Sequence, residues 1–249
     1  MMKLFLRSLQ IMMMGGLMSE VMFFDNFIED KNLIDEINQP KYWQHDLESC
    51  WFEKTNRPSN VFEKCVLEVV NKLKTLMDLP EAVGYDYWST SLPGGKVFHL
   101  NDLGERINLP EWMAANIRTY VDKKGYHMNM DDALFQRTGD FIWPSLVCSL
   151  CVHTEQTFEG GKYRIITTPY DTSTYFYPPE NDYSGDDLVE IESIPNRLVV
   201  IPIQCWRGVE PVVGDDQGRK TVDFLFWPHM TSRENFILND ANYIKEIFG

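Results

Sequence analysis

The sequence predicts a mostly β fold, a jelly roll or β-sandwich with a helical layer against one sheet. Three observations predict it. The clearest helical periodicity comes before Pro80, and most of the chain after that residue alternates apolar and polar positions. The alternating segments are rich in Val, Ile, Tyr and Phe, and Gly, Pro, Asn and Asp separate them, as in strands joined by turns. Helices followed by a run of short strands favour one sheet covered by helices.

The first elements are a short strand and two helices. Residues 23–39, FFDNFIEDKNLIDEINQ, predict a strand, a turn and a small amphipathic helix. A longer helix is expected to begin after Asn60, with Glu63 three residues on completing a capping box. It ends before Pro80, because proline cannot continue a helix. Its apolar stripe comprises Val61, Val66, Val69, Val70, Leu73 and Met77.

The predicted strands follow. Segments 141–154 and 161–168 are expected to form an antiparallel pair joined by a turn at residues 158–161. Residues 103–138 interrupt the strands with a helix around 110–124 and a polar loop, and residues 178–187 predict an acidic surface loop. The remaining strands are expected over residues 85–91, 95–101, 174–178, 188–193, 197–204, 208–213 and 220–228.

Composition limits the classes of function. With 249 residues, 44% of them hydrophobic, the chain is long enough to bury a sizeable core. The formal net charge is −14, whereas nucleic-acid binders concentrate Lys and Arg, so no nucleic-acid partner is expected. No segment is long and apolar enough to predict a membrane span. The composition suits a protein that acts on a small molecule or binds a basic partner, and it leaves the oligomeric state open.

The first 17 residues differ from the rest. Lys3 and Arg7 interrupt their apolar run, and no small-residue cleavage site follows. Residues 1–17 are therefore expected to be an N-terminal extension, either a presequence-like helix or an over-extended start, before a single domain over 18–249. Five cysteines in apolar segments predict reduced thiols and a cytoplasmic location. Cys148 and Cys151 should point to opposite faces of one strand, so no zinc site is expected.

Two patterns could carry chemistry. His99 ends a strand and shares its face with Asn101, and Asp102 follows, so an imidazole and an oxygen ligand could reach one metal ion. Arg219-x-Thr221 begins the last strand, and its spacing allows a guanidinium and a hydroxyl to clamp one carboxylate. Each pattern is weak alone, and a surface histidine before a turn explains the first one better than a metal ligand does.

In this order the segments resemble the iron(II)- and 2-oxoglutarate-dependent dioxygenases, in particular the prolyl-4-hydroxylase-like branch. The resemblance covers residues 82–229 and implies a double-stranded β-helix, a cupin-like jelly roll, with N-terminal helices packed on one sheet. It implies Fe(II) and 2-oxoglutarate as cofactors, and hydroxylation of a small molecule or a peptidyl side chain. The matching features are the aromatic strand with Tyr85, Tyr87 and Trp88, then His99 with its acid, residues 143–145, Gly160 and Gly161, residues 195–197, and Arg219-x-Thr221.

The resemblance also implies roles for residues. His99 and Asp102 would bind iron if the strand contains a bulge, and Asn101 would take the place of Asp102 if it does not. The far carboxylate of 2-oxoglutarate would bind Arg219, helped by Thr221. The aromatic strand would contribute a further hydrogen bond to the cosubstrate, from Tyr87 or Tyr85.

One position departs from the family pattern. The family's second imidazole ligand matches Arg207, and the distance along the chain to Arg219 fits the family spacing. A guanidinium is always protonated and has no lone pair to donate, so Arg207 cannot replace a histidine as a metal ligand. It places a positive charge where the resemblance expects a divalent cation.

Three interpretations stay open at this point. In the first, Arg207 occupies the metal's place in an inactive protein and pairs with Asp102 or Glu105. In the second, iron binds through His99, Asp102 and a substitute. In the third, the register differs, or a two-ligand site still supports turnover. The sequence thus predicts a dioxygenase-family protein, with a catalytically inactive jelly-roll binding or structural protein as the alternative. The substitute ligands considered for the second interpretation are Cys205 and His153.

Overall fold

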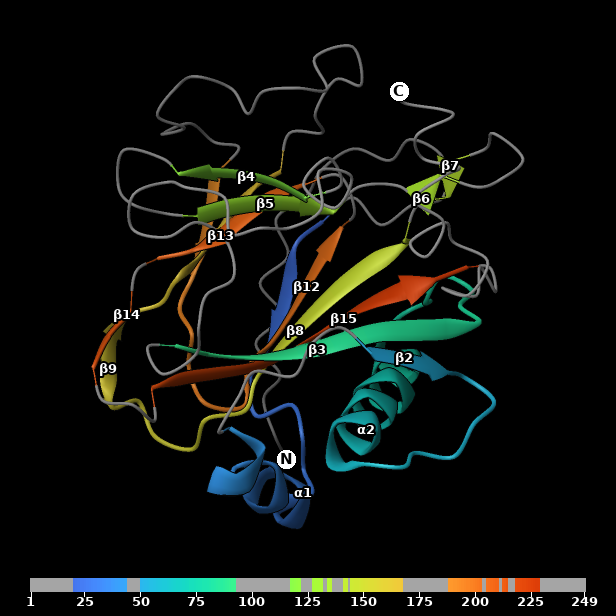
Figure 1. Cartoon of the computed structure of the whole chain (residues 1–249), viewed down its shortest axis with the longest axis horizontal. Helices are drawn as coiled ribbons and strands as arrows, with labels where there is room; N and C mark the ends of the chain where they lie inside the picture. Colours follow the sequence, from blue (N-terminus) through green and yellow to red (C-terminus); the bar gives the residue numbers. More distant parts are fainter. Residues whose placement is uncertain are drawn as a thin grey trace, which may run out of the picture.

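The structure is a computed structural model, and it describes residues 20–43, 50–92, 117–121, 127–131, 134–135, 141–142, 144–167, 188–202, 205–210, 212–214 and 218–228. The predicted extension 1–17, the strands predicted over 95–101 and 174–178, and the acidic loop 178–187 lie outside these residues. The described part is mostly β, with its two α-helices near the N-terminus (Figure 1).

Both predicted N-terminal helices are present. α1 (Lys31–Ile37) begins after Asp30, whose carboxylate accepts hydrogen bonds from the next turn. α2 (Val61–Leu76) begins after Asn60, whose side chain accepts from the backbone N–H of Glu63 at 2.9 Å. The Glu63 carboxylate reaches back one residue further than in a capping box, to the N–H and hydroxyl of Ser59. A 3₁₀ turn (Pro40–Tyr42) follows α1. Neither described α-helix combines the length and the hydropathy needed to cross a bilayer.

The strands form two main antiparallel sheets and two small ones (Figure 1). The large sheet has the order β1 (Met22–Phe24), β12 (Leu198–Pro202), β8 (Leu146–Cys151), β15 (Arg219–Trp227), β3 (Gly84–Leu92) and β2 (Cys50–Glu53). The second sheet has the order β11 (Leu188–Ile191), β10 (Tyr163–Ile166), β13 (Trp206–Val209), β5 (His127–Asp131) and β4 (Ile117–Val121). The small sheets pair β14 (Val212–Gly214) with β9 (Phe158–Gly160), and β6 (Leu134–Phe135) with β7 (Phe141–Ile142).

The connectivity is that of a jelly roll, which confirms the predicted fold. Strands β3, β8, β12 and β15 belong to the large sheet, and β5, β10, β11 and β13 to the second. Along the chain, these strands pass from one sheet to the other at every step except β10 to β11. Such alternation winds the chain into a double-stranded β-helix, with the interior between the two sheets.

The large sheet buries both of its faces. On β15, Val222, Phe224 and Phe226 belong to the cluster that packs against α1 and α2. Leu225 and Trp227 point the other way and pack against residues of the second sheet. We call these the helix face and the interior face. On β8, Cys148 lies on the helix face and Cys151 on the interior face, as predicted for cysteines three apart on one strand. All five cysteines are free thiols.

Two predictions about the middle of the chain are wrong. The segment predicted as a helix around 110–124 contains β4, which pairs with β5 over its whole length. The β-branched residues Ile117, Thr119 and Val121 alternate along β4, and pairing with a neighbouring strand outweighs a weak helical pattern. The predicted pair 141–154 and 161–168 does not form either. β8 pairs with β12 and β15, whereas β10 lies in the second sheet. The turn between them, with Gly160 and Gly161 at φ 79° and 75°, carries the chain between sheets.

The turn at residues 195–197 joins distant parts of the chain. Asn196 has a left-handed backbone (φ 56°), and its side chain both accepts from the N–H and donates to the carbonyl of Ile28, each at 2.8 Å. Arg197 binds both carboxylate oxygens of Asp25, at 2.5 and 3.0 Å, with its guanidinium over the Phe23 ring. These contacts fix the segment after β1 against the start of β12.

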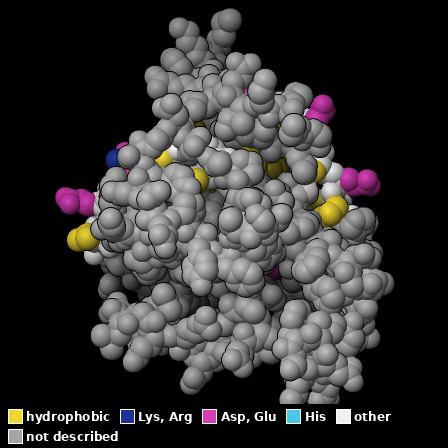
Figure 2. Space-filling model, turned by 90° about the horizontal axis from the view of Figure 1, so that it is seen from above, with side chains coloured by type: hydrophobic (Ala, Val, Ile, Leu, Met, Phe, Trp, Pro, Cys, Tyr) yellow, Lys and Arg dark blue, Asp and Glu magenta, His cyan; other side chains and the backbone are white. Residues whose placement is uncertain are grey.

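Acidic side chains lie on the described part of the surface. Asp and Glu side chains project at both sides of the view from above (Figure 2). The described lysine ion pairs lie at the surface and contribute about 0–1 kcal/mol each, so they indicate no functional site. They join Lys64 to Glu36 at 3.4 Å, Lys72 to Glu29 at 2.7 Å and Lys162 to Glu192 at 2.9 Å.

Candidate functional site

The candidate site begins on β15, where polar side chains occur at every second position. Arg219, Thr221 and Asp223 alternate with Val222 and Phe224, which lie on the helix face. The three polar residues therefore point to the interior. Arg219 is 2% exposed and Thr221 is 1% exposed. Placing a guanidinium in this position is costly unless it finds partners or a ligand.

Arg219 has partners from two other strands. Its Nε donates to the Ser193 hydroxyl at 2.8 Å, just after β11. Its guanidinium carbon lies 4.5 Å from the centre of the Tyr163 ring, on β10. Ser193 in turn donates to the Gly161 carbonyl. A Cβ at Gly161 would lie 3.0 Å from Cδ of Arg219, so glycine at 161 leaves room for the arginine. These contacts fix the orientation of the guanidinium.

A chain of hydroxyls connects this arginine to Asp223. The Ser149 hydroxyl donates to the Asp223 carboxylate. The Tyr163 hydroxyl lies 2.6 Å from Ser149 Oγ, and since Ser149 already donates to the acid, Tyr163 must be the donor in this contact. Thr221 donates to the other Asp223 oxygen at 2.9 Å. Burial raises the pKa of Tyr163 well above its usual value, which keeps the phenol protonated as this arrangement requires.

Asp223 is the acid of this cluster. Burial raises its pKa, while hydrogen bonds from Ser149 and Thr221 and the charges of Arg219 and Arg207 act in the opposite direction. The charges of both guanidinium groups therefore favour the ionised form of the same carboxyl, that of Asp223.

Arg207, on the second sheet, provides the second guanidinium group of the site. It lies on β13 opposite Ile165, whose side chain belongs to the interior core, so Arg207 points to the interior as well. Arg207, Asp223 and Trp88 are half-buried, in contrast to Arg219. Solvent therefore reaches the interior face beside Arg207 and Asp223, and Arg219 lies deeper.

The predicted ligands of iron and 2-oxoglutarate, apart from the substitutes Cys205 and His153, fall into three groups. His99, Asn101 and Asp102 lie outside the described residues. Arg219 and Thr221 lie together on the interior face. Tyr85 and Tyr87 lie on the helix face, opposite to Arg219.

Their position removes the reason for expecting these tyrosines at the cosubstrate. The Tyr87 hydroxyl donates to the Glu63 carboxylate and accepts from the Asn60 amide, each at 3.0 Å, so it binds the start of α2. Tyr85 packs edge-on against Phe226, with ring centres 5.1 Å apart. The register of β3, in which Tyr87 pairs with Phe224, determines this side of the sheet.

The described residues do not fit an iron centre. They include no group of three His, Cys, Asp or Glu side chains that could hold a metal ion. Burial raises the pKa of Cys205 to about 11, so its thiol stays protonated at neutral pH and is a poor ligand. His153 is 3% exposed, lies edge-on against Phe158 and has Nδ1 3.5 Å from the Lys220 carbonyl. Arg207 itself cannot ligate.

His153 predicts a pH dependence of stability. Burial lowers its folded-state pKa from 6.5 to about 4. Between these values the unfolded chain binds a proton that the folded chain does not, so stability falls as the pH decreases. We expect His153 to cost about 2–3 kcal/mol of unfolding free energy between pH 7 and 4.5. Urea unfolding of the wild type and His153→Gln at both pH values measures this loss. An equal loss in both proteins would contradict the prediction, because the other titrating groups are shared.

Four site residues were missed from the sequence: Ser149, Tyr163, Ser193 and Asp223. A signal for two of them was present. Ser149-x-Cys151 and Thr221-x-Asp223 repeat the two-residue period of a strand face, with polar residues where the neighbouring face is apolar. Tyr163 and Ser193 have no comparable pattern, since their contact with Arg219 comes from the jelly-roll connectivity.

Comparisons with known proteins give little further information. No family model matches the chain, and no curated protein matches it in sequence. Solved structures similar to the chain include a prolyl-4-hydroxylase from Pseudomonas putida, with 10% identity, a TM-score of 0.42 and coverage of 84% of this chain and 92% of that one. HygX from Streptomyces hygroscopicus, solved with nickel and 2-oxoglutarate bound, has 12% identity, a TM-score of 0.42 and coverage of 84% and 83%.

At these TM-scores the fold assignment rests on the strand order and pairing of the chain itself. The site defined by that fold contains a deep guanidinium, a set of hydroxyls and a second guanidinium nearer to solvent. Such an arrangement can bind a small anion, since guanidinium groups and hydroxyls are donors suited to carboxylates.

Proposed function

We propose that this chain is a jelly-roll protein of the iron(II)- and 2-oxoglutarate-dependent dioxygenase type, which binds 2-oxoglutarate through Arg219. The supporting observation is the buried guanidinium of Arg219, held between the sheets by Ser193 and Tyr163. A carboxylate there would receive charge-assisted hydrogen bonds in surroundings that exclude water. The proposed substrate is a small molecule or a peptide, hydroxylated with oxygen and 2-oxoglutarate. Iron would supply the oxidising chemistry, with His99 and Asp102 as its proposed ligands.

A second candidate function has its own supporting observation. Arg207 lies on the interior face, at the position where the family resemblance expects an imidazole ligand. A protein with this residue could keep the ligand-binding interior and lack catalysis. The second candidate is therefore a catalytically inactive jelly-roll protein that binds a ligand without iron.

Anaerobic titration separates the two candidates. The protein is mixed with Fe(II) and 2-oxoglutarate without oxygen, and the visible charge-transfer band of the ternary complex is recorded. Admission of air should then form succinate in the catalytic protein. Binding of 2-oxoglutarate without a band or succinate supports the inactive protein. No binding of 2-oxoglutarate under any of these conditions would contradict the proposed site at Arg219.

A further inference from the structure

We infer that Arg207 and Arg219 together bind the two ends of a short dicarboxylate, and that this binding requires no metal ion. The inference rests on the proposed carboxylate site at Arg219 and adds the second contact. It assigns to Arg207 a binding role in place of the ligand role that a guanidinium cannot fill.

The strand register brings the two arginines to one interior space. Arg207 lies opposite Ile165 on β10, two residues from Tyr163, and Arg219 stacks on the Tyr163 ring. Side chains two residues apart on a strand share a face and lie about 7 Å from each other. Both guanidinium groups also favour the ionised form of Asp223, so each lies within electrostatic reach of one carboxylate. Groups placed in this way offer one guanidinium to each end of a ligand that has two carboxylates on a short carbon chain.

The described charges on the interior face near the two arginines include a single acid. Near the two arginines, the acid on the described interior face is Asp223, which is already bound by Ser149 and Thr221. A further acid on this face, Asp86, pairs with Leu225 and Trp51, about 7 Å farther along the sheet. Among the described residues, the two guanidinium groups thus favour the ionised form of one carboxyl that is already hydrogen-bonded, although the chain as a whole carries −14.

The ligand can also reach this space. Arg207, Asp223 and Trp88 are half-buried although they belong to the interior faces. Part of the surface of Arg207 is therefore exposed, whereas Arg219 is 2% exposed. A dicarboxylate would enter with one end toward Arg219 and keep the other at Arg207. A monocarboxylate could make only the inner contact.

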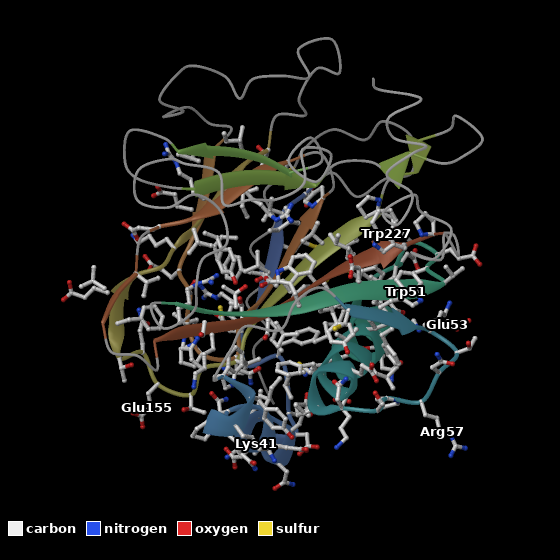
Figure 3. All side chains as sticks on the ribbon, in the orientation of Figure 1. Lys41, Trp51, Glu53, Arg57, Glu155 and Trp227 are labelled. Carbon is white, nitrogen blue, oxygen red and sulfur yellow. The ribbon has the colours of Figure 1, made fainter. Side chains whose placement is uncertain are left out.

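Calorimetric titration with glutarate and pentanoate in the presence of EDTA tests the inference. Glutarate has two carboxylates and pentanoate has one, and neither requires a metal for its chemistry. We expect the wild type to bind glutarate in EDTA, and Arg207→Met to weaken this binding about 10- to 100-fold. Pentanoate affinity should change less than about twofold in the same variant, because it lacks the outer contact. The control is Arg57→Met, which removes an exposed positive charge far from the interior (Figure 3).

The outcomes separate this inference from the proposed function. Equal glutarate affinity of the wild type and Arg207→Met would overturn the inference. Binding of 2-oxoglutarate only when Mn(II) replaces EDTA would also overturn it, and would leave the proposed function in place. Absence of binding in both conditions would contradict both. Arg207→His is expected to make ligand binding depend on a metal ion. Glutarate should bind this variant more weakly in EDTA than it binds the wild type, and the affinity of the protein for Mn(II) should increase. An Arg207→His variant that binds glutarate in EDTA like the wild type would count against the role of the guanidinium.

Discussion

Replacement of Arg219 by methionine is expected to remove ligand binding almost completely. Methionine keeps a similar length and apolar packing against Tyr163, but it lacks the charge and the donors that a carboxylate requires. A charge-assisted, bidentate contact in buried surroundings contributes about 2–3 kcal/mol, so the affinity for 2-oxoglutarate should fall about 100-fold. Isothermal titration with the wild type and the variant measures this directly.

Lys220→Met is the matched control for this variant. Lys220 is the next residue on β15, but its ammonium lies on the helix face, 5.4 Å from the Trp43 ring. The variant removes the same charge from the same strand on its other side, so the affinity for 2-oxoglutarate should stay within about twofold. Circular dichroism shows whether each variant folds. A folded Arg219→Met protein with wild-type affinity would remove Arg219 from the site.

Replacement of Asn196 by alanine is expected to have the largest effect on stability outside the site. Alanine removes both hydrogen bonds to Ile28 and must adopt the left-handed backbone of φ 56°. Unpaired Ile28 groups and a strained residue together cost about 2–4 kcal/mol. Urea unfolding of the wild type and Asn196→Ala measures the difference in unfolding free energy.

Asn196→Gly separates the effect of the lost hydrogen bonds from the effect of backbone strain. Glycine adopts a positive φ without strain but also lacks the side-chain hydrogen bonds. We expect the glycine variant to be more stable than the alanine variant by about 1 kcal/mol and less stable than the wild type. If alanine and glycine have equal effects, backbone strain contributes nothing at this position. A wild-type stability for both would show that the contacts to Ile28 are unimportant.

Local patterns predicted one long helix and several strands well. The helix after Asn60 and the strands of β3, β10, β12 and β15 follow from capping and from strong periodicity, which depend on neighbours in sequence. The alternation of Arg219, Thr221 and their apolar neighbours likewise indicated one polar strand face. These features need no knowledge of the partner strand.

The remaining features depend on which strands become neighbours. The segment of β4 was predicted as a helix because its local strand signal is weak, and pairing with β5 makes it a strand. Tyr87 was assigned to the ligand, although the register of β3 with β15 places it beside Phe224 on the helix face. A shift of one residue reverses the face of every side chain on a strand, so such assignments require the pairing itself. The contacts of Tyr163 and Ser193 with Arg219 likewise depend on which strands become neighbours.

The short strand β1 has a consequence for the behaviour of the protein in solution. It covers the free edge of β12, a strand whose five residues are all buried. Displacement of β1 would expose a row of unpaired backbone groups flanked by apolar side chains. Such an edge recruits strands from other molecules and promotes aggregation. We therefore expect the contacts of Asn196 and Arg197 with the segment after β1 to protect the protein from self-association, in addition to stabilising one molecule.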